Sequence, residues 1–308
     1  MFISYFKEKY KELATKSDLL RFRTDLIKTQ VTCGRILGEF NLVNKLKLIR
    51  SDIQKAEFQV FSQWGDDGII HFLTNYLDIP KKTFIEFGVE NYTECNTRFL
   101  LMNSNWSGLV LDGSESNINA IKADEISWRH DLMSICAFVT AENINDLISR
   151  KFVGEIGLLH VDIDGNDYWV WKAISVVNPI ILVIEYNSIF GPDKPWTVPY
   201  DPDFVRSKMH HSNLFYGTSI LSACDLAKEK GYSFIGCNSN GNNAYFVRDD
   251  KVADVKVLQP QEGFVLSKFS ESRDENGTLS FLRGEDRRLA IRGQNVFNTR
   301  TKTTESIL

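Results

Sequence analysis

The stretch FIEFGVENYTECNTRFLLMNSNWSGLVLD, residues 84–112, predicts a strand, a tight turn, a helix and a second strand. A short apolar run leads to Glu86, and Gly88, a residue typical of turns, follows two positions later. We expect Thr93 to cap the helix, and a second apolar run ends on Asp112. A βαβ unit of this kind winds right-handed into a parallel sheet, so the stretch predicts an α/β protein.

Two carboxylates, Glu86 and Asp112, fall at the carboxyl ends of these strands, 26 positions apart. In open parallel sheets, ligands bind in the crevice outside those ends. The separation is near the offset of about 20 residues at which a nucleoside-binding fold places an acid on the ribose hydroxyls. The pattern therefore predicts a nucleoside ligand beside these two acids.

The turn after the first strand indicates which nucleoside. A dinucleotide site uses G-x-G-x-x-G, but Gly88 stands alone here, with Glu90 and Tyr92 where further glycines would be expected. Glu86 and Glu90 would repel a phosphate, whereas the ammonium and sulfonium groups of S-adenosylmethionine suit neighbouring carboxylates. The alternative is that Gly88 only closes a βα turn, as it could in any α/β protein.

Composition bounds the class of protein. The chain has 308 residues, 43% of them hydrophobic, which is enough for one large domain and an appendage. No apolar run approaches the roughly 18 residues of a membrane span, and the N-terminus lacks a signal-peptide core. Five scattered cysteines, none at zinc spacing, favour free thiols in a reducing cytoplasm.

Charge is distributed unevenly along the chain. Residues 1–55 carry six more basic than acidic residues, whereas residues 56–280 carry 13 more acidic than basic ones. The acidic body is therefore a poor nucleic-acid binder. We expect residues 1–55 to form a helical arm that packs on its own domain or on a second subunit, which would make a homo-oligomer. The basic excess could instead dock on a membrane surface or an acidic partner.

Further strands are predicted downstream of the opening unit. Their ranges are Ser134–Val139, Ile156–Asp162, Pro179–Glu185, Tyr232–Cys237 and Ala244–Val247. The strand Pro179–Glu185 is almost wholly apolar, which is typical of a central strand covered on both faces. The last two strands predict an antiparallel hairpin that closes the sheet. The fold class is therefore α/β, with a Rossmann-like, seven-stranded, mostly parallel sheet flanked by helices.

Polar residues at two further strand ends predict the chemical centre. Asp162 ends one strand, and Glu185 and Asn187 follow the next. These hard oxygen ligands suit Mg²⁺ or another hard divalent ion, which would lower the pKa of a substrate hydroxyl. They could instead hold a substrate amine or hydroxyl without metal. Asp164 and Asp167 follow Asp162 and could belong to the same site, or could be turn and helix-capping acids.

A long loop, residues 190–216, carries four prolines and several aromatic residues, and long loops beside a site usually bind something. Within it, His210 and His211 are candidates for a general base near neutral pH, or could be exposed loop histidines. Near the start of the predicted domain, Gln63, Trp64 and Asp66 could border a ligand pocket, or serve packing and capping.

Three units follow from these patterns. Residues 1–55 form the helical extension, residues 56–258 the main domain, and residues 259–308 a polar, partly flexible extension in which periodicity fades.

Several ordered motifs resemble one family. They are SQWGDDGII at 62–70, FIEFGVENYTECNTRFLL at 84–101, GLVLDGS at 108–114, VDIDGNDYWVWKAI at 161–174, VIEYNSIFGPD at 183–193 and GYSFIGCNSNGNNAYFVR at 231–248. Together they are similar to the class I S-adenosylmethionine-dependent methyltransferases, and within them to the bacterial FkbM-like group. The resemblance covers about residues 58–250, and both extensions fall outside it.

The resemblance implies a set of cofactor contacts. Glu86 and Gly88 would meet the methionine part, Asp112 the ribose, and Gly113 and Ser114 would also lie at the cofactor, although Ser114 could equally cap the next helix. Asp162 would lie between cofactor and acceptor. The sequence departs from the family at Glu90 and Tyr92, which replace small residues.

The predicted function is methyl transfer from S-adenosylmethionine to an oxygen or nitrogen of a small acceptor. Because members of the FkbM-like group often act in surface-polysaccharide pathways, a sugar or decorated sugar is the expected acceptor. We expect Asp162 and Asn187 to position the substrates, with His210 or His211 as the base. The alternatives are an inactive binding or assembly module with the same fold, and a nucleotide-sugar or NAD enzyme.

Overall fold

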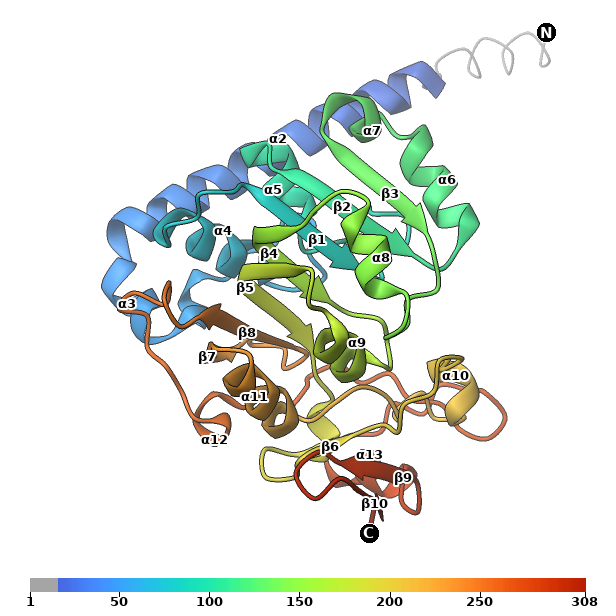
Figure 1. Ribbon diagram of the computed structural model, residues 1–308. Helices are drawn as coiled ribbons and strands as arrows, with labels where there is room; N and C mark the ends of the chain where they lie inside the picture. The colour runs from blue at the N-terminus through green and yellow to red at the C-terminus, as the bar shows by residue number, and fades with distance from the viewer. Residues whose placement is uncertain (1–15) are drawn as a thin grey trace, which may run out of the picture.

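The structure is a computed structural model that describes residues 16–308, so the first 15 residues of the predicted arm lie outside the described part. Its centre is a seven-stranded sheet in the order β3-β2-β1-β4-β5-β8-β7 (Figure 1). The strands are β1 (Thr83–Phe87), β2 (Ser107–Asp112), β3 (Leu132–Cys136), β4 (Gly154–Val161), β5 (Val177–Glu185), β7 (Tyr232–Cys237) and β8 (Asn243–Arg248). The predicted seven-stranded sheet is confirmed.

The connections place β1 at the point where the strand order reverses. β1 pairs in parallel with β2 on one side and with β4 on the other, and β8 pairs antiparallel with β5. A crevice opens where two neighbouring strands send their connections to opposite faces of the sheet. The fold therefore places the ends of β1, β2 and β4 around one crevice, as the sequence predicts for Glu86 and Asp112.

Helices cover both faces of the sheet. One face carries α3 (Leu46–Ser51), the short 3₁₀ helix η1 (Ile53–Ala56), α4 (Asp66–Tyr76), α5 (Arg98–Ser104), α6 (Glu115–Ala123) and α7 (Ile126–Arg129). The other face carries α8 (Ile144–Ser149), α9 (Asp167–Ala173) and α11 (Ile220–Glu229). The two layers are visible on either side of the sheet in Figure 1.

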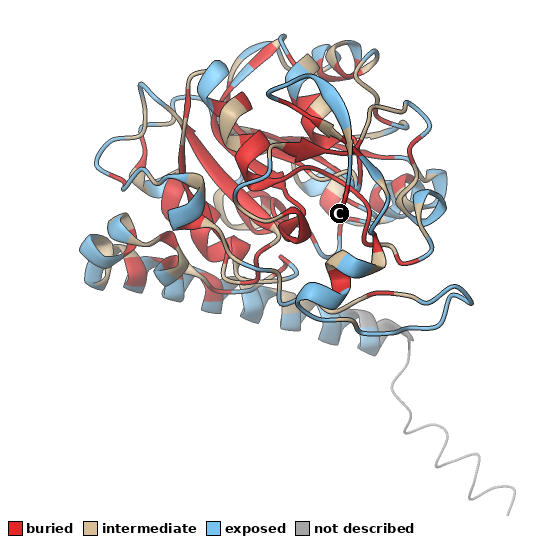
Figure 2. Cartoon of the chain, turned by 90° about the horizontal axis from the view of Figure 1, so that it is seen from below, coloured by how far each residue is buried: buried red, intermediate tan, exposed pale blue. Residues whose placement is uncertain are grey.

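Alternation along the strands divides the core into two layers. In β1, Ile85 and Phe87 face the α8–α9 layer, whereas Phe84 faces the α4–α5 layer. Successive side chains in a strand point to opposite faces, so a strand buried on both faces needs apolar residues at nearly every position. Figure 2 shows the buried residues concentrated on the sheet and on the inner sides of the helices.

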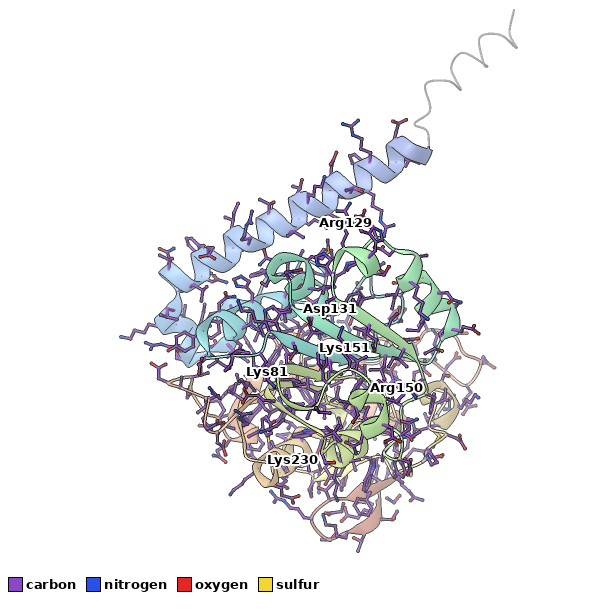
Figure 3. All side chains as sticks on the ribbon, turned by 45° about the horizontal axis from the view of Figure 1, so that its top comes forward. Lys81, Arg129, Asp131, Arg150, Lys151 and Lys230 are labelled. Atoms are coloured by element: carbon purple, nitrogen blue, oxygen red, sulfur yellow. The ribbon has the colours of Figure 1, made fainter. Side chains whose placement is uncertain are left out.

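The long helix α2 (Lys16–Asn44) runs across the α4–α5 layer, as Figures 1 and 3 show. Its contact depends on two glycines, because a Cβ on Gly34 would lie 2.5 Å from Val60 and one on Gly38 would lie 2.3 Å from the His71 ring. Ile27 and Val31 pack on the same side. The described part of the predicted helical arm, from residue 16 onward, therefore packs on its own domain.

The C-terminal extension, which the sequence predicts to be polar and partly flexible, contains α12 (Pro260–Gly263), α13 (Glu285–Ala290), β9 (Asn295–Asn298) and β10 (Thr303–Ser306). β9 lies between β10 and the short strand β6 (Trp196–Thr197), which comes from the long loop. Trp196 also donates to Glu305 at 2.7 Å. These contacts join segments about 100 residues apart, which local periodicity does not reveal.

Among residues 16–308, no helix combines the length and apolar character that crossing a bilayer requires.

Candidate active site

Two adjoining cavities open at the carboxyl ends of the central strands. The larger, of about 310 Å³, lies over β1, β4 and β5, and we call it the acidic cavity. The smaller, of about 210 Å³, lies over β2 and the segment after β3, and we call it the β2 cavity. Gly88, Glu90, Asp162 and Asp164 line both cavities. A ligand could therefore extend from one to the other past these four residues.

Gly88 sits where the backbones of two strand ends meet. Its φ is +70°, and a Cβ there would lie 2.0 Å from the carbonyl oxygen of Asp162. Only glycine fits such a backbone conformation at this distance. The predicted importance of Gly88 thus has a structural reason: it brings the loop after β1 against the end of β4.

The loop after Gly88 keeps left-handed turns without further glycines. Glu90 has φ of 47° and Tyr92 has φ of 62°, in the region that non-glycine residues rarely adopt. The Glu90 amide donates to the Asp112 carboxylate at 2.8 Å, and the Tyr92 ring is buried. These contacts hold in place a loop shape that the sequence pattern alone would assign to glycines.

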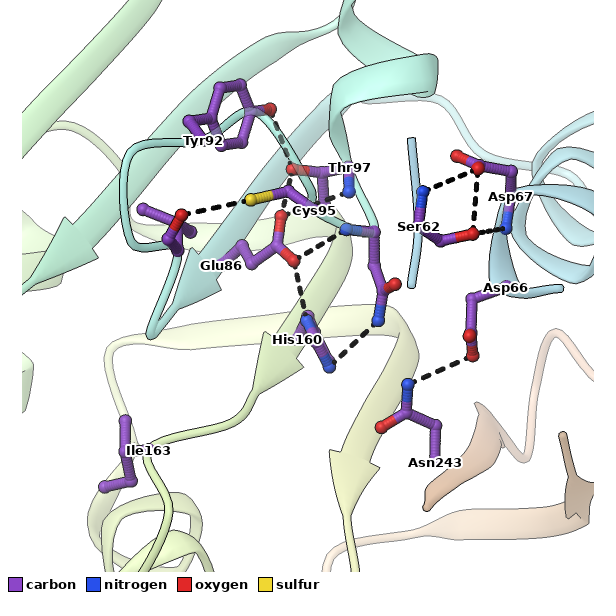
Figure 4. Close-up of polar contacts among 12 residues, drawn as sticks. Ser62, Asp66, Asp67, Glu86, Tyr92, Cys95, Thr97, His160, Ile163 and Asn243 are labelled. Atoms are coloured by element: carbon purple, nitrogen blue, oxygen red, sulfur yellow. Dashed lines mark hydrogen bonds and ion pairs between the residues drawn. The ribbon is translucent and has the colours of Figure 1, made fainter. Parts of the chain in front are cut away.

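Glu86 lines the acidic cavity, but its carboxylate is engaged by the chain itself (Figure 4). One oxygen accepts from the Asn96 amide at 3.0 Å and lies 2.9 Å from Nδ1 of His160. The other accepts from the Thr97 amide at 3.1 Å and from the Thr97 hydroxyl. Glu86 therefore has a structural role, because it joins β1 to β4 and to the start of α5. The residue before α5 is Thr97, so the prediction that Thr93 caps this helix is wrong.

The Glu86–His160 pair is buried and mutually stabilised. Burial alone would favour the neutral forms, but the hydrogen bond and charge of His160 lower the pKa of Glu86. The same contact raises the pKa of His160 despite burial. The pair thus favours a carboxylate beside an imidazolium.

Asp112 closes the other end of the crevice. One of its oxygens accepts from the Glu90 amide, and the other accepts from the Ser114 amide at 2.8 Å and the Asn117 side chain at 3.0 Å. Asp112 and Gly113 line the β2 cavity together with Phe138. The carboxylate is thus fixed by three donors beside a cavity with aromatic and apolar walls.

Ser114 caps a helix, which is the alternative to a cofactor contact that the sequence left open. Its hydroxyl accepts from the Asn117 amide at 3.4 Å and caps α6, and it is not among the residues that line either cavity.

Three carboxylates gather where the two cavities meet. Asp162, Asp164 and Glu185 each offer an oxygen, and these oxygens lie within 4.8 Å of one another; we call them the acid cluster. The Oε2 atom of Glu185 is buried, and no group among residues 16–308 forms a hydrogen bond to it. A buried carboxylate oxygen that lacks a donor is costly, so the cluster has the character of a site for a cation or a donor group.

The acid cluster strongly perturbs its own protonation. Burial, with the charges of Asp164 and Asp167 adding to it, raises the pKa of Asp162 to about 7 although His160 opposes the shift. Burial and the charge of Asp162 raise the pKa of Glu185 well above its usual range. A carboxyl with a pKa near neutrality can accept a proton at physiological pH.

Arg206 faces the acid cluster from the long loop. It forms an ion pair with Asp164, donates to the Asn213 carbonyl at 2.8 Å, and lies 3.7 Å from the centre of the Tyr216 ring. Arg206 and Tyr216 both line the acidic cavity. The long loop therefore contributes a cation and an aromatic wall, in agreement with the prediction that it lies beside the site.

The rim on the α4 side matches a further prediction. Gln63, Trp64 and Asp66 line the acidic cavity. Asp66 accepts from Asn238 at 3.1 Å and from Asn243 at 3.0 Å, which ties α4 to β8 and to the turn before it.

Asn187 lies outside both cavities. Its amide group donates to the carbonyls of Leu214 and Tyr216 at 2.9 and 3.0 Å, and its oxygen accepts from the Ile189 amide. It therefore anchors the long loop to the end of β5. Asp164 stands in the acid cluster where the sequence places Asn187.

The two loop histidines also lie elsewhere. His210 and His211 stack on each other with ring centres 4.2 Å apart, and Nδ1 of His210 lies 2.7 Å from the Ser212 hydroxyl. Neither is among the residues that line the two cavities. Burial and the neighbouring His211 lower the pKa of His210.

Sequence reasoning missed His160 and Arg206, whereas Asp164, for which it left the role of a turn acid open, belongs to the acid cluster. Strand alternation was a usable signal for His160, because residues 160 and 162 of HVD point to the same side of β4, and β1 places Glu86 directly opposite His160. For Arg206 the sequence carries no such signal, because its position depends on the fold of the long loop.

No family model and no curated protein matches the sequence. Solved structures with a similar fold include an O-methyltransferase from Bacillus cereus in complex with SAH, with 14% identity over 72% of this chain and 100% of that chain at a TM-score of 0.38. An S-adenosylmethionine-dependent methyltransferase from Clostridium acetobutylicum shares 13% identity over 68% of this chain and 99% of that chain, at a TM-score of 0.38.

The citrinin polyketide synthase CMeT domain shares 13% identity over 62% of this chain, at a TM-score of 0.40, and this chain spans 55% of its length. Similarities of this size do not indicate an activity. The function has to be inferred from the residues of this chain.

Proposed function

We propose that this protein transfers a methyl group from S-adenosylmethionine to an acceptor bound in the acidic cavity. The observation that carries the proposal is the pair of adjoining cavities at the strand-order reversal, which share Gly88, Glu90, Asp162 and Asp164. A donor in one cavity and an acceptor in the other would meet beside Asp162.

The residues present fit an adenosyl cofactor. Asp112 would accept from the ribose hydroxyls, and Phe138 and Val139 offer apolar surface to the adenine in the β2 cavity. Because the Glu86 oxygens are engaged, Glu90 is the carboxylate we assign to the ammonium group. When bound, the cofactor supplies an electrophilic methyl group on sulfur.

Positioning is the main task of the chain. Holding the acceptor atom about 3–3.5 Å from the methyl carbon and in line with the C–S bond can contribute roughly 7–11 kcal/mol. As the acceptor oxygen or nitrogen bonds to the methyl carbon, the C–S bond breaks and the acceptor loses a proton. We assign that proton to Asp162, whose pKa of about 7 suits a general base.

The acid cluster offers a second use of the same residues, in which Asp162, Asp164 and Glu185 would hold a hard divalent cation such as Mg²⁺. Asp162 would then be a metal ligand, and the cation instead of the Asp162 carboxylate would promote loss of the acceptor proton by lowering its pKa. Oxygen ligands of this kind are those that Mg²⁺ prefers, and the unpartnered Glu185 oxygen supports such a use. Undiminished methyl transfer after treatment with EDTA would remove the metal from the proposal and leave the cluster to bind the acceptor directly.

For the acceptor we propose a sugar or decorated sugar of a surface-polysaccharide pathway, methylated on oxygen or nitrogen in the cytoplasm. The resemblance of the motifs to the FkbM-like group supports the sugar. Polar groups that could bind hydroxyls, such as Asn240 and Asn242, line the acidic cavity. All five cysteines are free, which supports a reducing compartment.

A transfer assay with methyl-labelled S-adenosylmethionine tests the function. The full chain would be incubated with a panel of sugars, sugar phosphates and sugar amines, and label in the product would be counted. We expect transfer to at least one acceptor, and transfer that is slower by about 10²–10⁴-fold with Asp162→Asn. Binding of the cofactor without transfer to any acceptor would favour the inactive module, and binding of NAD instead would favour the nucleotide enzyme.

A further inference from the structure

A third cavity, of about 260 Å³, lies beside the acidic cavity. It is formed by η2 (Ser188–Phe190), the segment 264–267 and α13, and we call it the α13 cavity. Ser267 lines both this cavity and the acidic cavity. The two spaces are therefore neighbours, although different elements form most of their walls.

A buried arginine with no ion-pair partner among residues 16–308 lines the α13 cavity. Arg287 is 6% exposed, its Nη1 donates to the Phe269 carbonyl, and its Nε has no hydrogen-bond partner within the described part of the chain. Burial and the charge of a second cation, Arg206, lower the pKa of Arg287. A buried charge without a partner destabilises a protein, so an anion that reaches Arg287 would compensate that charge on binding.

The charges around the cavity agree with an anionic ligand. Arg288 also lines it and reaches Glu285, whose oxygen lies 3.4 Å from its Nε. The three side chains leave one net positive charge. Guanidinium groups match the geometry of phosphate oxygens, with two parallel hydrogen bonds to one group.

We propose that the α13 cavity binds a phosphate-class oxyanion through Arg287 and Arg288. Where the proposed methyl transfer holds, on which this extension rests, the oxyanion would be part of the acceptor, because Ser267 connects the two cavities. The binding of the anion itself does not require transfer.

Calorimetric titration of the full chain with inorganic phosphate tests the proposal. We expect saturable binding that weakens about tenfold in Arg288→Gln and more in Arg287→Gln, whereas Arg292→Gln, an exposed arginine on the same segment, keeps the wild-type affinity. Arg287→Lys keeps the charge and guards against a folding defect, and should retain part of the affinity. Absence of phosphate binding by the folded wild-type chain, or equal binding by all variants, would overturn the site, whatever the outcome of the transfer assay.

An independent observation concerns the outer face of α2. Eight residues at strict heptad spacing all face solvent there, and we call them the α2 stripe; they are Leu19, Phe22, Leu26, Thr29, Cys33, Ile36, Phe40 and Val43. Six of them are large apolar residues, with Phe22 67% and Val43 77% exposed. Alternating spacings of three and four residues over four heptads are the pattern of a coiled-coil seam.

The domain itself does not cover this stripe. The helix packs on the domain through Gly34 and Gly38, which fall between the stripe positions on another side of the helix. Figure 3 shows α2 at the outer edge of the molecule with side chains projecting away from the sheet. A stripe of about 36 Å along the helix axis is thus open to a partner.

We infer that the α2 stripe pairs with the stripe of a second copy in a parallel coiled coil. A regular heptad is complementary to itself, so the same residues serve both sides of a twofold interface. If the two helices paired antiparallel along their full length, Asp25 of each would lie beside the partner's Glu39. The interface would then contain two pairs of like charges. A parallel, in-register pairing instead places Asp25 near the partner's Gln30, with no pair of like charges at these positions. Asp25 contacts Lys28 of its own helix only weakly, at 3.5 Å on the surface.

Sedimentation velocity of the full chain tests the dimer. We expect a dimer for the wild-type chain and a monomer for the double variant Leu26→Glu/Ile36→Glu, whose folding should be intact because both positions face solvent. Val153→Glu, an exposed apolar residue outside the stripe, should remain dimeric. A monomeric wild-type chain, or a dimer unchanged by the double variant, would overturn the inference.

Cys33 tests the orientation. In a parallel, in-register pair it meets the partner's Cys33 at the middle of the seam, so mild oxidation should give a disulfide-linked dimer in a Cys136→Ser background, which removes the other exposed thiol. Cys33→Ser should abolish that product. A dimer that forms no such disulfide would overturn the parallel register.

Discussion

Glu86 and Glu185 are buried carboxylates at the ends of strands in one sheet, and they are used in opposite ways. Every oxygen of Glu86 has donors from the chain, namely the amides of Asn96 and Thr97, the Thr97 hydroxyl and His160. Glu185 has an oxygen without any partner and two further acids beside it.

Glu86 thus stabilises the fold, whereas Glu185 has an oxygen that is available to a ligand. The contacts of Glu86 lower its pKa, whereas burial and neighbouring acids raise that of Glu185. Three acids beside one arginine, Arg206, are kept at a cost in stability, and such perturbed groups concentrate at functional sites. Substitutions at these and neighbouring acids should therefore differ in their effects on stability and on methyl transfer.

Glu86→Gln should have the largest effect on stability. The amide would present N–H groups to backbone donors and leave His160 without its counter-charge, so we expect a loss of about 3–5 kcal/mol in the free energy of unfolding. Urea denaturation measures it. The contribution of the pair should be greatest between the unfolded pKa values of the two groups, roughly pH 4.5 to 6.5. It should be lost as the pH falls through the lowered pKa of Glu86 or rises through the raised pKa of His160. A loss no larger than that of a surface substitution would contradict the structural role.

Asp162→Asn should reduce the rate of methyl transfer by about 10²–10⁴-fold while leaving the fold intact. In the wild-type enzyme the rate should rise with pH through about 7, as the carboxyl loses its proton, and this limb should be absent in the variant. Asp203→Asn, an exposed acid on the long loop, is the matched control. A variant with the wild-type rate and pH profile would remove Asp162 from the chemistry.

Glu185→Gln should stabilise the protein by about 1–3 kcal/mol at pH 8 and much less at pH 5. The sign follows from the raised pKa: the folded state holds the proton, so ionisation at high pH disfavours folding, and the amide escapes that cost. Thermal melting at both pH values measures the difference. If the variant instead melts lower than the wild type at pH 8, Glu185 is a structural acid like Glu86.

Glu90→Gly should have the smallest effect on stability, a gain of up to about 1 kcal/mol, because glycine adopts the positive φ without steric cost. The same change should weaken S-adenosylmethionine binding, since it removes the carboxylate assigned to the ammonium group. Thermal melting and titration on one preparation separate the two effects, and unaltered cofactor affinity would reject that assignment.

The sequence was sufficient for the sheet because its strands are short apolar runs bounded by turn residues. The central βαβ unit, the hairpin of β7 and β8 and the position of Gly88 are local features, and the structure confirms them. Asp162 follows directly from the end of β4, and it lies in both cavities.

The remaining site residues depend on long-range packing. Whether Asn187 or Asp164 reaches the acid cluster depends on the left-handed turn at Asp164, with φ of 57°, and on the carbonyls that Asn187 meets in the folded loop. Likewise, the order of the C-terminal extension comes from partners such as Asp225, which pairs with Arg300 at 2.6 Å across 75 residues. A single sequence carries no periodic signal for such contacts.

Titration calorimetry with S-adenosylhomocysteine, on the full chain and on Asp112→Asn, decides whether the crevice binds an adenosyl cofactor. We expect saturable one-to-one binding by the wild-type chain and an affinity at least about tenfold lower in the variant, close to 1.4 kcal/mol. A folded wild-type chain that binds no S-adenosylhomocysteine, or a variant that binds it equally well, would overturn the proposed function.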